Sequence, residues 1–167
     1  MYYLDLLNEF HYSGIKYMIV GGLSVNLHGI PRVTQDIDII ISLDRENITG
    51  VTGILKKFGY VPKLPVNPDD LTDESIRESW IREKNLIAFS FCHTRDQYKI
   101  IDIVLVHPLD FDTSYKNRTV KSVRDFTINL VCIDDLITMK KYSARNQDLS
   151  DIELLKKLKV FMDGDNG

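Results

Sequence analysis

The feature that most constrains the fold of this chain is a pair of aspartates inside an otherwise apolar run. Asp36 and Asp38 begin the segment D-I-D-I-I-I, which ends at Ile41. Because side chains in a strand alternate between its faces, the two carboxylates point the same way, roughly 6–7 Å apart, while the intervening isoleucines face a core. Neighbouring carboxylates repel each other and are costly to bury unpaired, so the pattern predicts a bound cation. Oxygen ligands suit Mg²⁺ or Mn²⁺.

A third acid adds to this pattern. Asp102 stands alone in the apolar run I-I-D-I-V-L-V. An aspartate is rarely buried in the middle of such a strand unless it has a binding partner. If its strand lies beside the first, three carboxylates converge, and three acids can hold two divalent ions that bridge a nucleoside triphosphate and a nucleophile. Two structural alternatives stay open: Asp102 lies on the solvent side of an edge strand, or it pairs with an arginine such as Arg32.

The combination of these acids with a preceding glycine pair resembles the DNA polymerase β-like nucleotidyltransferase superfamily. The resemblance rests on G-G, thirteen intervening residues, D-I-D-I and the later isolated strand aspartate. The wider pattern R-V-T-Q-D-I-D-I and the tail M-K-K-Y-S-A-R-N-Q-D-L-S-D-I are similar to small bacterial and archaeal members, including AbiEii-type toxins of abortive-infection systems. The similar segments are roughly residues 17–43, 99–106 and 136–155.

The glycine pair suits a phosphate-binding turn. Gly21 and Gly22 leave backbone N–H groups free to approach phosphate oxygens, since no side chain obstructs them. A short helix expected over 23–27 presents its N-terminus to the same anion. The commonest form of the family turn is Gly-Ser, whereas here the serine comes two positions later, so Ser24 either contacts phosphate or packs on the helix.

The resemblance also implies roles for residues outside the turn. Arg32 either binds a phosphate, braces the aspartates or lies on the surface, and Thr34 either contacts the nucleotide or caps a turn. In the tail, Lys140 is favoured over Lys141 for neutralising the triphosphate, while Arg145, Asp148 and Asp151 either contact substrate or form a salt-bridged helix start. The implied catalytic and metal-binding residues are Asp36, Asp38 and Asp102, and the implied nucleotide-binding residues are Gly21, Gly22, Ser24, Arg32, Thr34 and Lys140.

The function implied by the resemblance is metal-dependent transfer of a nucleoside monophosphate from a triphosphate to an acceptor. The acceptor would be RNA or tRNA, a protein or a small molecule, in a toxin–antitoxin or defence setting. The alternative is a catalytically weak or inactive member of the fold that binds a partner, such as a cognate antitoxin or a second copy of the chain. A haloacid-dehalogenase-type phosphatase is excluded, because residues 31–35 are not the apolar strand which that site needs before its first aspartate.

Composition limits the classes of binding partner and the cellular compartment that we expect. The formal net charge of −3 gives no support for long nucleic acid as the main partner. The basic stretch over 116–124 is expected to be solvated surface, with RNA contact as the alternative. Two cysteines without C-x-x-C spacing predict free thiols in the cytoplasm. No basic leader precedes the first helix, and no apolar run approaches the ~20 residues needed to cross a bilayer.

The order of elements predicts an α/β (α+β) fold in a single domain over residues 1–167, with a core over about 14–132 and C-terminal helices over about 133–162. We expect a mixed, twisted sheet that carries the acids on one face, helices on the other face, and a C-terminal helical pair. Prolines exclude a regular element over 62–68, so residues 60–80 are expected to form a mobile surface excursion anchored by Trp80, with room for a helix from about Thr72. Expected helices cover 2–12, 23–27, 44–59, 133–142 and 149–162, and expected strands cover 17–20, 36–42, 86–92, 98–106 and 126–131.

Overall fold

The computed structural model describes residues 2–165. The strands are β1 (Tyr17–Val20), β2 (Ile37–Ile41), β3 (Tyr60–Pro62), β4 (Ala88–His93), β5 (Asp96–Val104), β6 (Thr119–Val123) and β7 (Phe126–Leu130). The helices are α1 (Leu4–Tyr12), α2 (Gly21–Leu27), α3 (Arg45–Lys57), α4 (Glu74–Lys84), α5 (Phe111–Lys116), α6 (Ile133–Ser143) and α7 (Asn146–Asp165), with a 3-10 turn over Pro68–Thr72.

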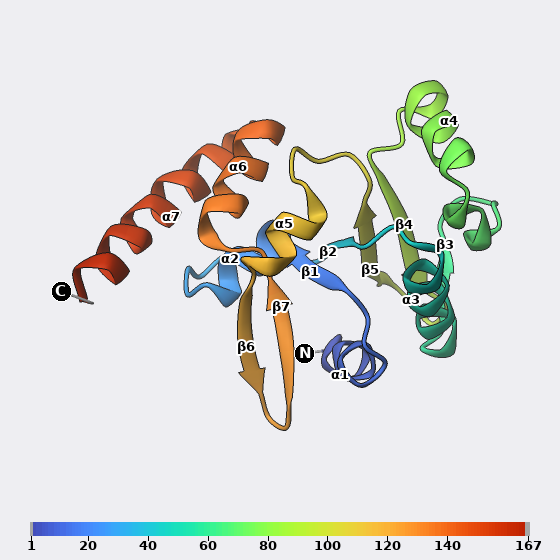
Figure 1. Ribbon diagram of the computed structural model, residues 1–167, viewed down its shortest axis with the longest axis horizontal. Coiled ribbons are helices and arrows are strands. Elements are labelled where there is room, and N and C mark those ends of the chain that lie inside the picture. Colours follow the sequence, from blue (N-terminus) through green and yellow to red (C-terminus); the bar gives the residue numbers. More distant parts are fainter. Residues whose placement is uncertain (1, 166–167) are drawn as a thin grey trace.

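The described strands form one mixed sheet in the order β3-β4-β5-β2-β1-β7-β6 (Figure 1). β2 is antiparallel to β1 and parallel to β5, and β1 is parallel to β7. β4 and β5 form the expected antiparallel hairpin. This arrangement confirms the predicted fold class, and α6 followed by α7 supplies the predicted C-terminal helical pair.

Alternating side chains divide the apolar interior into two cores, one on each face of the sheet. β1 places Tyr17 and Ile19 in the core beneath α1 and α3, and it places Met18 and Val20 in the core beneath α2, α6 and α7. In β2 the residues on the acid-bearing face include Ile40, which is fully buried in the second core. Helices therefore cover both faces rather than one, because the acid-bearing face also carries apolar side chains that must leave water.

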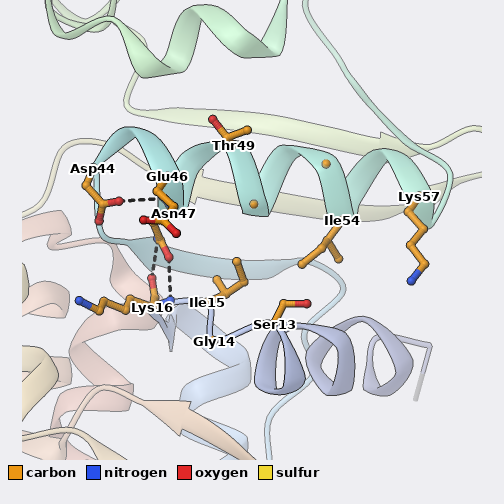
Figure 2. Close-up of a pocket in the computed structure, with 12 residues that line it drawn as sticks. Ser13, Gly14, Ile15, Lys16, Asp44, Glu46, Asn47, Thr49, Ile54 and Lys57 are labelled. Atoms are coloured by element: carbon orange, nitrogen blue, oxygen red, sulfur yellow. Dashed lines mark hydrogen bonds between the residues drawn. The ribbon is translucent and has the colours of Figure 1, made fainter.

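The start of α3 ties together the strands that lead into the site. The Asp44 carboxylate accepts a hydrogen bond from Asn47 N at 2.8 Å, which confirms the expected N-cap. The Asn47 side chain accepts from Lys16 N at 2.8 Å and donates to Lys16 O at 3.0 Å (Figure 2), and it also donates to Ser42 O at 2.9 Å. One buried amide thus joins the beginning of β1 to the end of β2.

The segment over residues 60–80 is part of the folded body rather than a surface excursion. Tyr60–Pro62 pairs with β4 at the edge of the sheet, where a proline costs no ladder hydrogen bond. Leu71 and Trp80 are buried in the first core, and the Trp80 ring stacks on Phe89 with centroids 5.4 Å apart. The expectation of a loose excursion was wrong because these two apolar side chains bury against α3 and β4. The anchoring role of Trp80 is confirmed.

Several helices differ from the expected pattern. α2 begins at Gly21, two residues earlier than expected, and α4 begins at Glu74, two residues later than expected. α5 was not predicted; it is short, and Asp110 caps it by accepting a hydrogen bond from Thr113 N at 3.1 Å. α7 begins at Asn146, three residues earlier than expected, and is 20 residues long. Among residues 2–165, no helix is both long enough and apolar enough to span a membrane.

Candidate active site

The three predicted acids meet on one face of the sheet. Asp38 in β2 stands directly opposite Asp102 in the parallel pairing with β5, and Asp36 comes immediately before β2. All three line one pocket of about 840 Å³, which we call the main pocket. Asp102 lies on an inner strand, and the ion-pair partner of Arg32 is Asp151 instead. Both structural alternatives for Asp102 therefore fail.

The electrostatics of the three acids favour a cation beside them. Burial first, and then the neighbouring carboxylates of Asp102 and Asp36, raise the pKa of Asp38 to about 6, against the opposing effect of Arg145 and Lys140. The pKa of Asp36 is also raised, first by burial and then by Asp102. Burial and the neighbouring carboxylates thus make the ionised forms of Asp36 and Asp38 less favourable, and positive charge beside them would relieve this cost.

The donor set fits a metal ion that binds together with substrate. Asp102 Oδ1 is buried and has no hydrogen-bond partner, as expected for an oxygen whose partner is a ligand. Within residues 2–165, no group of three or more His, Cys, Asp and Glu side chains is arranged so that it could hold a metal ion. Mg²⁺ usually takes only one or two carboxylates from a protein and completes its octahedron with water and substrate phosphates. Asp38 and Asp102, which stand opposite each other in neighbouring strands, fit that mode of binding.

The glycine turn lies against these acids. Gly21 is the first residue of α2 and has φ +65°, a left-handed conformation that favours glycine. A Cβ at Gly21 would lie 2.1 Å from Asp38 Oδ2, and one at Gly22 would lie 2.9 Å from Thr34 Oγ1 and 3.1 Å from Arg32 Cζ. The pair is therefore required for close packing of the turn against Asp38 and the following loop, as well as for open backbone N–H groups.

The loop between α2 and β2 is held by a residue that the sequence interpretation missed. Asn26 accepts a hydrogen bond from Arg32 N and donates one to Arg32 O, both at 2.6 Å. Its single amide thus closes the loop and fixes the backbone from which the Arg32 side chain extends. Thr34 donates a long hydrogen bond of 3.4 Å to Asp36 O and lines the main pocket.

Five charged side chains, which we call the ion network, lie beside the acids. Asp151 pairs with Arg32 at 2.6 Å and with Lys140 at 2.8 Å, and Asp148 pairs with Lys140 at 3.2 Å and with Arg145 at 3.0 Å. Burial opposes ionisation of Asp148, but hydrogen bonds from Arg145, Ser143 and Lys140 outweigh it and hold its pKa well below the usual range. The network consists of Arg32, Lys140, Arg145, Asp148 and Asp151.

The network decides between the alternatives left open for the tail. Asp148 and Asp151 pair with cations of the protein and so form the salt-bridged arrangement. Lys140, Arg145 and Asp148 also line the main pocket. Lys141 is exposed outside it. Ser24 is fully buried in α2, its hydroxyl has no hydrogen-bond partner, and it does not line the pocket. The structure therefore brings together all the predicted site residues except Ser24.

A second pocket lies on the other side of the molecule. It measures about 540 Å³ and lies between α3 and the segment Ser13–Lys16 (Figure 2). Some of its polar side chains are bonded within the protein, as for Asp44 and Asn47 above and for Lys57, which pairs with Glu9 at 2.8 Å. This second pocket contains none of Asp36, Asp38 and Asp102, which all line the main pocket.

Comparison with solved structures identifies the fold. The lincosamide antibiotic adenylyltransferase LnuA, in its lincomycin-bound crystal structure, is 18% identical with a TM-score of 0.60, over 94% of this chain and 96% of that chain. The crystal structure of ANT(2")-Ia with adenylyl-2"-tobramycin is 10% identical with a TM-score of 0.53, over 93% and 89%. An antigenic nucleotidyltransferase-like protein from Paracoccidioides brasiliensis is 18% identical with a TM-score of 0.53, over 92% and 73%.

The sequence itself gives the family. No match was found among curated proteins. A model of one protein family, described as nucleotidyltransferases of unknown function (DUF6036), matches residues 5–160, which include the glycine turn, the three acids and the ion network. This match confirms the nucleotidyltransferase resemblance, while the toxin–antitoxin setting stays a prediction. The chain belongs to the DUF6036 family of nucleotidyltransferases.

Proposed function

We propose that this protein is a Mg²⁺-dependent nucleotidyltransferase that moves a nucleoside monophosphate from a nucleoside triphosphate to a hydroxyl acceptor. The observation that carries the proposal is the meeting of Asp36, Asp38 and Asp102 in one pocket beside a glycine turn. LnuA is a lincosamide antibiotic adenylyltransferase, and ANT(2")-Ia was crystallised with an adenylylated tobramycin. ATP is therefore the first donor to test.

In this proposal, different residues of the pocket bind the metal ion and the phosphates. Asp38 and Asp102, with Asp36 beside them, would hold Mg²⁺, which when bound would supply positive charge to offset the charge on the phosphate oxygens. The open N–H groups of the turn at Gly21 and Gly22 bind phosphate oxygens. Lys140 and the other cations of the ion network face the same charge, and their own carboxylate partners hold them in place.

The transfer step follows from the position of Asp102. Its unpartnered Oδ1 accepts the proton of the acceptor hydroxyl, whose oxygen forms a new bond to the α-phosphorus. The bond between the α-phosphorus and the bridging oxygen of the β-phosphate breaks, and pyrophosphate leaves with that oxygen. Orientation supplies much of the rate, because the acid, the donor and the acceptor are held in one pocket.

The test combines nucleotide binding with transfer. Calorimetry with a non-hydrolysable ATP analogue should show binding that requires Mg²⁺, and α-labelled ATP should release pyrophosphate in the presence of a competent acceptor. The double variant Asp36→Asn, Asp38→Asn should lose both signals by at least a hundredfold. The control is Asp69→Asn, Asp112→Asn, which changes two exposed acids outside the pocket and should behave as wild type. Equal signals from the two double variants would refute the proposal, and absence of nucleotide binding by the wild type would favour the partner-binding alternative.

A further inference from the structure

The main pocket has two halves of different chemistry, and the sheet order separates them. From the glycine turn after β1, the next strands are β2 with Asp38, then β5 with Asp102, then β4. All charged side chains that line the pocket belong to the three acids or to the ion network, which packs against the turn through Arg32. The part of the pocket beyond Asp102 is built from other residues.

The sheet side of this second half is apolar. Val104 and Val106 follow Asp102 at intervals of two, and all three line the main pocket. Ala88 stands opposite Val104 in the β4–β5 pairing, and Ile87 precedes it. Together with two residues from the facing wall, described next, these four side chains form what we call the apolar half.

The facing wall is α6. Met139 and Tyr142 lie one helical turn apart and both line the pocket, which completes the apolar half. The rim of the apolar half carries apolar side chains that are unusually exposed to solvent. Ile87 is 62% exposed, Tyr142 is 59% exposed, and Val33 on the opposite loop is 89% exposed. Exposed apolar groups gathered around one pocket indicate a surface that is covered when a ligand is bound.

One polar side chain in this region is oriented by the backbone. His107 Nδ1 accepts a hydrogen bond from Leu109 N at 3.3 Å, and burial lowers the pKa of the ring. The neutral ring therefore carries its proton on Nε2, and it can donate one hydrogen bond to a ligand. Largely apolar walls with a few placed polar groups, as in the apolar half, are the usual form of a small-molecule site.

We propose that the acceptor is a small, uncharged, hydroxylated compound with an apolar face, which binds in the apolar half and presents its hydroxyl to Asp102. This inference rests on the proposed function and specifies its acceptor. Binding places the apolar face against Val104, Val106 and Met139, with the hydroxyl between Asp102 and the α-phosphorus. The hydroxyl proton passes to Asp102 as the new oxygen–phosphorus bond forms and pyrophosphate leaves.

The chemistry of the apolar half disfavours the charged classes of acceptor. RNA needs cations along its phosphates, and the cations of the pocket lie in the other half, where the ion network holds them. A polycationic amino sugar needs carboxylates of its own, and the acids that line the pocket are those placed at the metal or paired within the network. A neutral compound needs neither, and it gains from covering the exposed rim.

The experiment measures acceptor binding to protein saturated with Mg²⁺ and a non-hydrolysable ATP analogue. Four probes are compared by calorimetry: n-octyl β-glucoside below its micellar concentration, a tricationic amino sugar, a ribo-oligonucleotide, and a peptide containing serine and tyrosine. The glucoside should bind most tightly. Val106→Lys should weaken its binding at least tenfold and should not weaken nucleotide binding, because the added charge is opposite to that of the triphosphate. The control is Val160→Lys, which places the same charge at an exposed position of α7 outside the pocket and should change neither affinity.

Each outcome decides between the two proposals. Preferential glucoside binding that is weakened by Val106→Lys and unaffected by Val160→Lys supports the inference. Preferential binding of the amino sugar, the oligonucleotide or the peptide overturns it, as does the lack of binding by all four probes to nucleotide-loaded protein, and the proposed function then stands without it. If the nucleotide analogue itself does not bind, the proposed function fails and the inference fails with it.

Discussion

Gly21 allows a strict test of the link between the glycine turn and the acids. The chain contains a matched control, because Gly14 has φ +67° and Gly21 has φ +65°, but a Cβ at Gly14 would meet no atom within 4 Å. Each Gly→Ala change therefore carries the same backbone strain, about 1–2 kcal/mol, partly offset by about 0.4–1 kcal/mol from the stiffer unfolded chain. Gly14→Ala should lower the free energy of unfolding by about 1 kcal/mol, or the melting temperature by about 2–4 °C.

Gly21→Ala should have a further effect at the site. Its Cβ would lie 2.1 Å from Asp38 Oδ2, so the carboxylate must retreat by about 1.3 Å to reach the 3.4 Å of ordinary van der Waals contact. A misplacement of about 1 Å in a catalytic site can cost about a hundredfold in rate. We expect Gly21→Ala to lower the rate of pyrophosphate release about a hundredfold, while Gly14→Ala stays within twofold of wild type.

The assays are urea denaturation for stability, calorimetry with Mg²⁺ and the ATP analogue for binding, and pyrophosphate release for turnover. If Gly21→Ala and Gly14→Ala lose the same stability, and both retain wild-type nucleotide binding and turnover, then Asp38 does not depend on the turn. That result would refute the argument that the glycine pair exists to let Asp38 approach.

Three other predictions concern charge and packing. Because the pKa of Asp38 is raised from 3.8 to about 6, the native state holds its proton more tightly than the unfolded state. Metal-free wild type should therefore lose about 2 kcal/mol more stability than Asp38→Asn as pH rises from 4 to 7, measured by denaturation at several pH values, and saturating Mg²⁺ should reduce the loss. Asp151→Asn breaks a buried set of ion pairs and should cost about 3–5 kcal/mol, whereas Asp134→Asn breaks an exposed pair and should cost under about 1 kcal/mol; equal losses would contradict the burial argument. Trp80→Ala should cost about 3–5 kcal/mol in chemical denaturation, and a loss below 1 kcal/mol would show that the segment over 60–80 is not part of the core.

The acid-bearing face could be predicted from the sequence because its signal is local. Side-chain alternation in a strand places Asp36 and Asp38 together whatever lies around them. The position of Asp102 needed one further assumption, that its strand lies beside β2, and the parallel pairing meets that assumption. The cap at Asp44 is local in the same way, since its partner is three residues away.

The parts that could not be predicted depend on contacts between distant residues. The partner of Arg32 is Asp151, 119 positions later, and no spacing in the sequence indicates that pair. The role of Asn26 depends on the closure of a loop six residues long. The segment over 60–80 was predicted to be an excursion because its prolines exclude a regular element locally. The burial of Leu71 and Trp80, by contrast, depends on the whole fold.

The pairing of Arg32 with Asp151 has a consequence for the order in which the parts of the main pocket form during synthesis. A nascent chain exposes the three acids and Arg32 well before the ribosome reaches residues 140–151. Until then Arg32 lacks the carboxylate that fixes it, and Asp38 lacks the nearby positive charges of Lys140 and Arg145 that partly offset its burial. The side of the pocket that carries the ion network is therefore assembled last, when the C-terminal helical pair docks.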